Sequence, residues 1–446
     1  MLNRFFSRRA WVVCLFGIIV CGCEPKPAPT PSNASKPATH NKKSQPQSPA
    51  KKAADDPAAI KALEAAGVRV VKDKSGIVIE VSVATDKNLT EVLANLAGVP
   101  NVEIARFGGP GITDEAVKSL SKLVNLRRLD LTDSAITDKT LAVVGQLRKL
   151  VSLALRRTAV TDGGLANLEG LPSLRAIDLR NTNITNAGLD HLAKIKSLVD
   201  VQLERSKVTD AGVAKLEGLK LKSINLNYCT SISDAALAVL GKITSLESIQ
   251  LDSTKISDAG MASIENLKNL KRLRIRDTDI TGAGFAHIGK LTKLQRLELR
   301  STSIDDAGLA VITALPNVTY LDIGECRLVT ADGIKKLDKL TGLTYLVLWE
   351  TKTNDAAMAA LGDLVNLEDL NLKATAITDA SVPVILKYQK LTRLNVAGTQ
   401  LSDDGFLKLA KLPNLKWLNV ANTSIGFDVV DKLNEKKGLE VVEYDN

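Results

Sequence analysis

A hydrophobic pattern about 24 residues long recurs along most of the chain. It is clearest in LRRLDLTDSAITDKTLAVVGQL, from Leu126, and LVSLALRRTAVTDGGLANLEGL, from Leu150. A fixed period of this length predicts a solenoid, in which each unit packs only on its neighbours. Further copies begin at Leu174, Leu198, Leu221, Leu246, Leu270, Leu294, Val318, Leu343, Leu367, Leu391 and Leu415, and weaker ones at Val78 and Val102.

Each unit contains two spacings of apolar residues. Leu129 and Leu131 alternate with polar residues, which predicts a short strand whose leucines point inward. Leu141, Val144 and Leu147 follow at a spacing of three, which is typical of one face of a short helix. Units of this kind predict an α/β solenoid, a right-handed horseshoe with parallel strands on its concave face and short helices on its convex face.

Helix starts and strand ends are marked by polar residues. Thr137 suits an N-cap, and the carboxylate of Asp138 favours the positive end of the helix. A column of hydroxyls marks the point where each strand turns away, and we interpret it as a structural ladder that binds backbone groups left unpaired by the turn. Its members are Thr158, Thr182, Ser206, Thr254, Thr278, Thr302, Thr351, Thr375, Thr399 and Thr423, with Cys229 and Cys326 at the same position in two repeats.

The repeat pattern resembles the 24-residue leucine-rich repeats of bacterial surface and effector proteins, in the ribonuclease-inhibitor-like superfamily. The two repeats with Cys229 and Cys326, each one residue longer, resemble the cysteine-containing repeats of F-box-type proteins. The resemblance covers about residues 78–446 and implies recognition of a partner along the concave strand face. No F-box-like helical segment precedes the repeats, which counts against a ubiquitin-ligase adaptor.

The ends of the chain predict a leader, a tether and two caps. Residues 1–22 combine the basic MLNRFFSRR with an apolar stretch too short to span a membrane, as in a signal peptide. Residues 23–58, rich in Pro, Ala, Ser and Lys, predict a disordered tether. Residues 59–77 suggest a helix and a hairpin that form an N-terminal cap, residues 78–438 comprise fifteen repeats, and residues 439–446 are a C-terminal cap remnant.

The leader also contains a candidate lipidation site. Val20-Cys21-Gly22-Cys23 resembles a lipobox, in which small residues precede a cysteine that becomes lipid-modified, here Cys23. The sequence therefore favours an exported, membrane-anchored lipoprotein of the cell envelope. Cys21 is unusual at its position in that motif, so simple secretion and an uncleaved anchor remain alternatives.

Charge and composition argue against several function classes. The net charge is +9, but residues 1–58 carry nine basic and three acidic residues, which leaves the other 388 residues with 50 basic and 47 acidic. Near balance in the repeats disfavours nucleic-acid binding. The three histidines have no plausible ligands at metal spacing, and no nucleophile, base and orienting group can be assembled from the repeat positions. We therefore expect no metal, no cofactor and no enzymatic activity.

One part of the concave face is a candidate binding site. Strand positions that face solvent in four consecutive repeats bring arginines beside three of the chain's few aromatic residues. Arginine and aromatic side chains are enriched where binding energy concentrates. The competing interpretation is a solvated face, salt-bridged by acidic residues such as Asp252, Asp277 and Glu298. The candidate ligand-binding residues are Arg272, Arg274, Arg276, Arg296, Arg300, Tyr320, Tyr345 and Trp349.

The sequence thus favours a monomeric recognition or scaffold module whose partner is a protein with an acidic surface, or an anionic glycan. An F-box-like substrate adaptor and a purely structural surface protein are the alternatives.

Overall fold

The computed structural model describes residues 53–443, so the predicted signal peptide, Cys23 and nearly all of the predicted tether lie outside the described residues. Residues 53–443 build one sheet of 17 strands. Successive strands pair in chain order: β1 is antiparallel to β2, and every later pair is parallel.

The strands are β1 (Arg69–Lys72), β2 (Val78–Ala84), β3 (Ile104–Gly108), β4 (Arg128–Asp130), β5 (Ser152–Ala154), β6 (Ala176–Asp178), β7 (Asp200–Gln202), β8 (Ser223–Asn225), β9 (Ser248–Gln250), β10 (Arg272–Arg274), β11 (Arg296–Glu298), β12 (Tyr320–Asp322), β13 (Tyr345–Val347), β14 (Asp369–Asn371), β15 (Arg393–Asn395), β16 (Trp417–Asn419) and β17 (Glu440–Val442).

The α-helices are α1 (Pro57–Ala65), α2 (Thr90–Leu93), α3 (Asp138–Val144), α4 (Asp162–Leu165), α5 (Asn186–Leu192), α6 (Asp210–Ala214), α7 (Asp234–Leu240), α8 (Asp258–Met261), α9 (Gly282–Phe285), α10 (Asp306–Thr313), α11 (Ala331–Lys335), α12 (Asp355–Ala360), α13 (Val382–Ile385), α14 (Asp403–Leu409) and α15 (Phe427–Asn434). Short 3₁₀ helices are η1 (Ala94–Gly98), η2 (Lys118–Lys122), η3 (Ala166–Leu168), η4 (Ala262–Ile264), η5 (Ala286–Ile288), η6 (Lys336–Lys339), η7 (Leu361–Asp363) and η8 (Asp379–Ser381).

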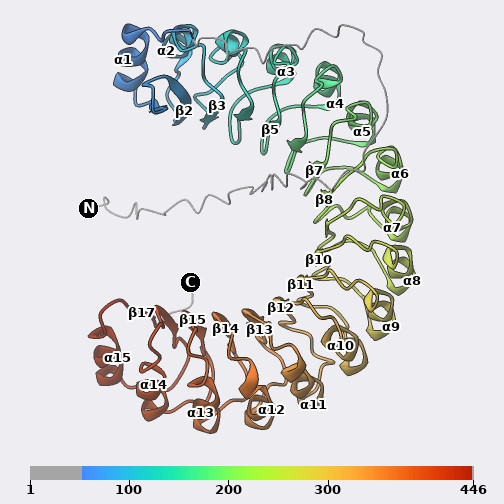
Figure 1. Cartoon of the computed structure of the whole chain (residues 1–446), viewed down its shortest axis with the longest axis vertical. Coiled ribbons are helices and arrows are strands. Elements are labelled where there is room, and N and C mark those ends of the chain that lie inside the picture. The colour runs from blue at the N-terminus through green and yellow to red at the C-terminus, as the bar shows by residue number, and fades with distance from the viewer. Residues whose placement is uncertain (1–52, 444–446) are drawn as a thin grey trace, which may run out of the picture. The chain divides into compact units, whose positions relative to one another are not determined.

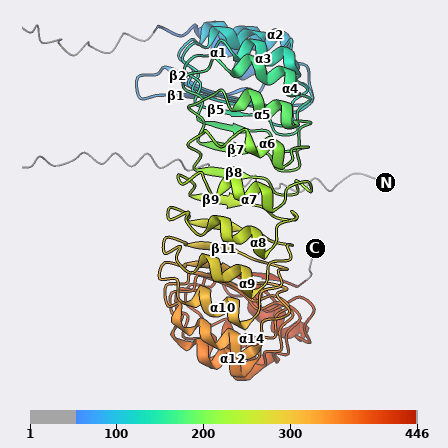
Figure 2. The same ribbon diagram turned by 90° about the vertical axis from the view of Figure 1, so that its right-hand side faces the viewer.

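The repeats stack into an open horseshoe. Strands line its inner rim and helices its outer rim (Figure 1), and helices α5–α9 lie one below another when the convex side is viewed directly (Figure 2). The wider helices on one side and the narrow strands on the other make the stack curve. This arrangement confirms the predicted horseshoe. Within residues 53–443, no helix has both the length and the apolar character needed to cross a membrane.

The core is a continuous aliphatic column. In one representative repeat Leu129, Leu131, Leu141 and Val144 are each no more than 2% exposed, so strand leucines and helix leucines meet in the interior. The same positions are buried in every repeat that follows, and one cluster runs from Leu63 to Leu439. Each unit therefore buries its apolar faces against its neighbours, as a solenoid requires.

The N-terminal end of the sheet is covered by α1 and the β1–β2 hairpin. The Asp56 side chain accepts a hydrogen bond from the Ala58 N–H and caps α1. Asp55 accepts from the Val78 N–H at 2.6 Å, and the Asn101 side chain donates to the Ala53 carbonyl at 2.6 Å. The end of the predicted tether, residues 53–58, is therefore held against β2 and the first repeat by polar contacts that its composition does not reveal.

After each of the strands β5–β7, β9–β11 and β13–β16, one residue has a left-handed backbone and the next residue carries the hydroxyl of the ladder. The left-handed residues include Arg157 at φ 54° and Asn181 at φ 55°. The Thr158 hydroxyl then donates to the Leu155 carbonyl at 2.7 Å, closing the turn. The same bond is made by Thr182, Thr254, Thr278, Thr302, Thr351, Thr375, Thr399 and Thr423.

The cysteine repeats use a different bond. The Cys229 thiol donates to the Leu203 carbonyl of the preceding repeat at 3.2 Å, and the Ser206 hydroxyl lies 3.7 Å from the Cys229 sulfur. The Cys326 thiol contacts the Leu299 carbonyl in the same way. A thiol therefore links two repeats where a threonine closes only its own turn.

Candidate functional site

The eight candidate ligand-binding residues lie together on the concave side of β10–β13. Strand register places Arg272, Arg296, Tyr320 and Tyr345 in one row, which we call the outer row. A middle row, two residues further along each strand, comprises Arg274, Glu298, Asp322 and Val347. An inner row just beyond the strands comprises Arg276, Arg300, Gly324 and Trp349, joined through backbone bonds between neighbouring turns.

The outer row contains a stack of one cation and two rings. The Arg296 guanidinium lies 3.6 Å from the centroid of the Tyr320 ring, and the Tyr320 and Tyr345 rings are stacked 4.0 Å apart at 7°. Burial, followed by a hydrogen bond to Tyr345, raises the pKa of Tyr320, and burial also raises the pKa of Tyr345. Both phenols therefore remain neutral at physiological pH. A strand spacing of about 4.8 Å matches the spacing of stacked rings, so the sheet itself orders them.

The stack is part of a longer row. Beyond Tyr345, Asp369 pairs with Arg393 at 3.3 Å, and the Arg393 guanidinium lies 4.1 Å from the centre of the Trp417 ring. The outer row thus continues to β16, with an arginine against a ring at Arg296–Tyr320 and again at Arg393–Trp417. The positions of Arg393 and Trp417 in the outer row can be read from the repeat period, whereas the stacking of one on the other cannot.

Trp349 lies between two cations in the inner row. Its ring centroid is 5.7 Å from the Arg300 guanidinium and 5.3 Å from Lys373 Nζ. Gly324 stands between Arg300 and Trp349 in the row and carries no side chain to separate them. The Trp349 Nε1 atom is buried and has no acceptor within the described part of the chain. Lys373 was not among the predicted residues, although the period places it next in this row.

Two buried carboxylates neutralise much of the arginine charge. Glu298 accepts from Arg272 and from Arg296, both at 2.7 Å. Asp252, whose side chain is 0% exposed, pairs with Arg274 at 2.6 Å and Arg276 at 2.7 Å. The competing interpretation, a salt-bridged face, is therefore correct for the buried layer of this surface. The Glu298 and Asp252 carboxylates in that layer hold the arginines in fixed positions.

Arg300 is less well paired than its neighbours. Its Nε lies 3.5 Å from Glu325 and its terminal nitrogen 3.9 Å from Asp277, and within residues 53–443 its guanidinium makes no hydrogen bond. A guanidinium has five N–H donors, so Arg300 keeps donors that a ligand can use. The same holds for Arg296, which uses only Nε, and for Arg272, which uses one terminal nitrogen.

Asp322 is a buried carboxylate with no ion pair in the described residues. It accepts a hydrogen bond from the Gly324 N–H at 3.1 Å. The pKa of Asp322 is raised to about 6, chiefly by burial and also by the nearby Glu298, while the Gly324 N–H bond, Arg276 and Arg300 oppose the shift. The charge of the middle row therefore changes in mildly acidic solution. The sequence showed Asp322 in its row but gave no sign of its burial.

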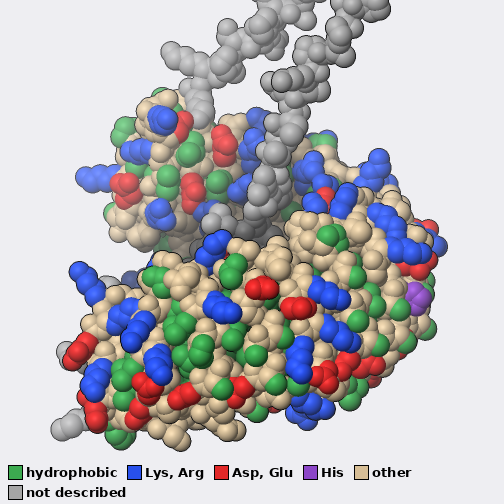
Figure 3. Space-filling view, turned by 60° about the horizontal axis from the view of Figure 1, so that its bottom comes forward, with side chains coloured by type: hydrophobic (Ala, Val, Ile, Leu, Met, Phe, Trp, Pro, Cys, Tyr) green, Lys and Arg blue, Asp and Glu red, His purple; other side chains and the backbone are tan. Residues whose placement is uncertain are grey.

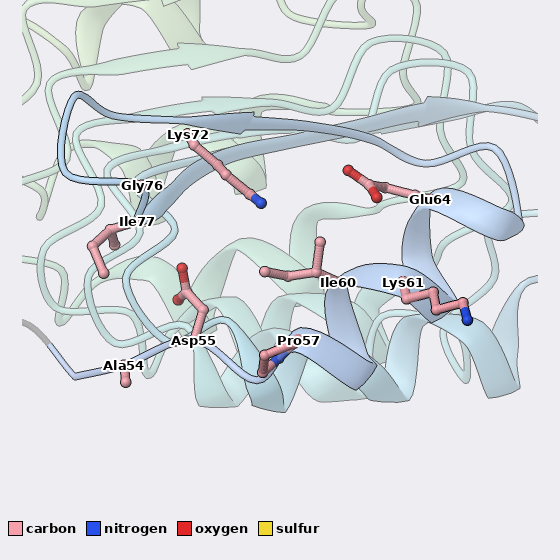
Figure 4. Close-up of a pocket in the computed structure, with 9 residues that line it drawn as sticks. All are labelled: Ala54, Asp55, Pro57, Ile60, Lys61, Glu64, Lys72, Gly76 and Ile77. Carbon is pink, nitrogen blue, oxygen red and sulfur yellow. The ribbon is translucent and has the colours of Figure 1, made fainter.

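Two pockets are formed by residues outside these rows. One, of about 370 Å³, opens between α1 and the β1–β2 hairpin of the cap (Figure 4). Its charged residues are of both signs, and Asp55 is already bonded to the Val78 N–H. The other, of about 260 Å³, lies beside the inner row at the turn that follows β12. Among residues 53–443, no group of three or more His, Cys, Asp or Glu side chains is placed to hold a metal ion.

Charges of both signs are mixed on one face of the molecule. On the face that Figure 3 presents, Lys and Arg side chains lie among Asp and Glu side chains and no large region carries a single sign. This mixing agrees with the near balance of charge counted in the repeats. This face therefore carries no broad field of a single sign.

Comparisons with known proteins identify the fold. Residues 170–193, 290–312 and 389–410 match the leucine-rich-repeat family model. An internalin, InlF of Listeria monocytogenes, is 21% identical, with 82% of this chain and 96% of that chain covered and a TM-score of 0.53. A chain of the Rad7–Elc1 complex from yeast is 17% identical, with 74% and 84% covered and a TM-score of 0.50. A search of the curated proteins gave no match.

The chain therefore contains leucine-rich repeats and has the leucine-rich-repeat horseshoe fold. At these identities the likeness to solved structures shows the fold alone.

Proposed function

We propose that this chain is a non-catalytic recognition module that binds a protein partner through the concave face of β10–β13. The leucine-rich-repeat fold commonly serves protein–protein interaction. The observation that carries the proposal is the Arg296–Tyr320–Tyr345 stack, which leaves two rings and a cation partly exposed on the inner rim.

The side chains of this surface are already ordered before a partner binds, which favours affinity. Rings that are already stacked lose little side-chain entropy when a partner covers them, so more of the contact energy appears as affinity. Trp349, between Arg300 and Lys373, is restrained in the same way. Tyrosine, tryptophan and arginine at the centre of an interface supply most of its binding energy.

The chemistry of the partner follows from the unused donors of Arg296 and Arg300. A carboxylate from the partner can accept two parallel N–H bonds from one guanidinium, which is the strong form of this pair. An acidic protein surface that also carries apolar side chains suits both the rings and the arginines. An anionic glycan offers carboxylates or sulfates with less apolar area, and the experiment below distinguishes it.

The test is capture of the partner by the purified full chain from an extract of the source cells, with identification by mass spectrometry. A triple variant, Tyr320→Ala with Tyr345→Ala and Trp349→Ala, should weaken binding of the captured protein at least about 30-fold. These changes leave Glu298 and its arginines in place, whereas charge reversal of Arg272 or Arg296 would strand a buried carboxylate.

Tyr228→Ala is the matched control. Tyr228 also lies under a guanidinium, that of Arg205 at 4.8 Å, but four repeats away from Tyr320. We expect the control to change affinity less than about twofold. Equal binding by the triple variant and the wild type would place the interface elsewhere. Release of the captured material by glycosidase treatment would favour the glycan.

We infer further that the module is displayed from the cell envelope as a lipoprotein. The basic segment MLNRFFSRR, the apolar stretch after it and the cysteine at position 23 support this inference. Mass analysis of the mature N-terminus tests it, with a diacylglyceryl-modified Cys23 as the expected first residue. An unmodified Cys23 peptide would leave secretion or an uncleaved anchor instead.

A further inference from the structure

The pocket beside the inner row lies at the edge of the concave face. It is lined by Ser301, Thr302, Ser303, Glu325, Arg327 and Leu328 and has a volume of about 260 Å³. Ser301 directly follows Arg300, and the Glu325 N–H donates to the Trp349 carbonyl at 2.8 Å. The pocket is thus continuous with the Arg300–Trp349 part of the surface, and we call it the edge pocket.

The edge pocket exists because the repeat of Cys326 is one residue longer than most. The register partners Leu321 and Leu346 are 25 residues apart, whereas Leu297 and Leu321 are 24 apart. The Cys326 side chain is buried below the turn, and the extra length puts Arg327 and Leu328 outside. The Leu328 side chain is 55% exposed, which is unusual for a leucine in this chain.

The other cysteine repeat offers a direct comparison. There Arg205, Lys207 and Tyr228 occupy the places of Ser301, Ser303 and Glu325, and Arg205 stacks on Tyr228 at 4.8 Å. Its turn carries Thr230 and Ser231 in place of Arg327 and Leu328. In the Cys229 repeat, large side chains cover the turn and the two residues after the cysteine are small. In the Cys326 repeat, serines lie at the bottom of the pocket, and the two residues after the cysteine, which form its rim, are large.

The chemistry of the rim points to one kind of ligand. Leu328 offers an apolar contact, and within residues 53–443 the exposed Arg327 makes no hydrogen bond or ion pair. The Glu325 carboxylate is already engaged, by the Ser301 hydroxyl at 2.6 Å and by Arg300 Nε at 3.5 Å. A matching segment therefore carries an apolar side chain for Leu328 and an adjacent carboxylate for Arg327.

We propose that the edge pocket is the second half of the concave interface, and that it receives an apolar side chain next to an acidic one from the same protein partner. This inference rests on the proposed function of the concave face. The partner then passes over the ends of β11 and β12 and contacts both the rings of the outer row and the rim at Leu328. An interface bent around this edge fixes the orientation of the partner along the horseshoe.

The test is site-specific photocrosslinking in the full chain, with benzoylphenylalanine placed separately at position 345, 328 or 231. We expect positions 345 and 328 to crosslink the same protein, and the peptide attached at 328 to contain an acidic residue beside an apolar one. Position 231, which is the equivalent of 328 in the other cysteine repeat, should give no adduct with that protein.

The pair of substitutions Arg327→Thr and Leu328→Ser supplies the affinity measurement. They copy Thr230 and Ser231, which this chain already tolerates at the same turn, so folding should be retained. We expect binding of the captured partner to weaken about tenfold, against less than about twofold for Thr230→Ala with Ser231→Ala.

The outcomes separate the two proposals. An adduct at 345 without one at 328, together with unchanged affinity of the Arg327→Thr, Leu328→Ser variant, overturns the edge pocket and leaves the concave interface standing. An adduct at 328 with a different protein, or with a second copy of this chain, also overturns it. Absence of adducts at both positions overturns both proposals.

Discussion

The Asp138 carboxylate holds Thr161 of the next repeat by two hydrogen bonds, one from its backbone N–H at 2.7 Å and one from its hydroxyl at 2.6 Å. Thr161 in turn is the N-cap residue of the next helix, α4. The contact therefore fixes the start of one helix to the start of its neighbour. Equivalent pairs are Asp114–Thr137, Asp162–Thr185, Asn186–Thr209, Asp210–Ser233, Asp234–Ser257, Asp258–Thr281, Asp306–Thr330, Asp355–Thr378 and Asp379–Ser402.

Where the acid of a pair is missing, the residue opposite it changes type. Gly282 takes the place of the acid, and the position of the next threonine is held by Asp305, which caps its own helix through the Ala307 and Gly308 N–H groups. A Cβ at position 282 would lie only 2.2 Å from an Asp305 oxygen. The two residues are therefore matched to each other.

The first prediction is that this exception can be converted into a regular pair. Gly282→Asp alone sets two carboxylates against each other. Asp305→Thr alone exchanges a carboxylate that accepts from two N–H groups of α10 for a hydroxyl that faces no acid at position 282. Each single change should therefore lower the free energy of unfolding. The double variant should recover about 1–2 kcal/mol relative to the sum of the two losses. Urea denaturation of the four proteins measures this coupling. Additive losses would show that residues 282 and 305 act independently.

The second prediction concerns the left-handed residue after each strand. Ala374 adopts φ 52° and Gly398, one repeat later, adopts φ 63°. A left-handed backbone costs a non-glycine residue about 1 kcal/mol or more. Ala374→Gly should raise the free energy of unfolding, and Gly398→Ala should lower it by about 1 kcal/mol. The Cβ added at 398 meets nothing closer than 3.7 Å, so crowding does not contribute. Thermal denaturation of both variants gives the signs.

The third prediction is a pH dependence from Asp322. Burial raises the pKa of this carboxyl from 3.8 to about 6, so the folded chain takes up its proton more readily than the unfolded chain. The stability contributed by protonation is fully present below pH 3.8 and is lost as the pH rises through about 6. Asp322→Asn mimics the protonated form and should be more stable than the wild type at pH 7.

The two proteins should approach equal stability near pH 4. The unfolding free energy of Asp322→Asn minus that of the wild type should therefore increase by on the order of 3 kcal/mol from pH 4 to pH 7. Denaturant titrations of both proteins at the two pH values measure this change. A difference that does not change with pH would place the charge of Asp322 in a well-solvated or fully paired state.

The fourth prediction is that two thiols are unreactive in the folded chain. Cys229 and Cys326 are free and buried, and burial raises the pKa of Cys326 to about 11 and that of Cys229 above its ordinary value. Only the thiolate is alkylated rapidly. Iodoacetamide at pH 8 should leave both peptides unmodified in native protein and modify both in urea, as mass spectrometry of the digest will show. Rapid labelling without denaturant would mean that the turns open readily.

The sequence predicted the horseshoe well because leucine spacing reports directly which way a side chain faces. Leu129 and Leu131 could be assigned to a strand, and Leu141 and Val144 to a helix, from their positions alone. The rows of the concave face follow from the same period. It predicts that Arg296 and Tyr320 are neighbours in one row, and in the structure they are.

Contacts that depend on side-chain rotamers could not be predicted. The face of the Tyr320 ring that Arg296 covers, and the sharing of Glu298 by two arginines, are decided by packing after the backbone is set. The Asp138–Thr161 contact was missed for another reason. From the sequence, Asp138 is assigned only a favourable charge at its own helix, because its partner is 23 residues away. The exchange of residue types at Gly282 and Asp305 was the signal that could have revealed it.

Because of the Asp–Thr contacts, deletions of the same length at different places in the chain should not be tolerated equally well. Excision of residues 282–305 joins Thr281 to Asp306. The contact before the new junction is then Asp258–Thr281 and the contact after it is Asp306–Thr330, so an acid faces a hydroxyl in both. Excision of residues 259–282 removes the same length but leaves Asp258 facing Asp305. In chemical terms a unit of the solenoid therefore runs from the first residue of one helix to the N-cap residue of the next, because removal of such a unit takes out both members of one contact and leaves the other contacts matched.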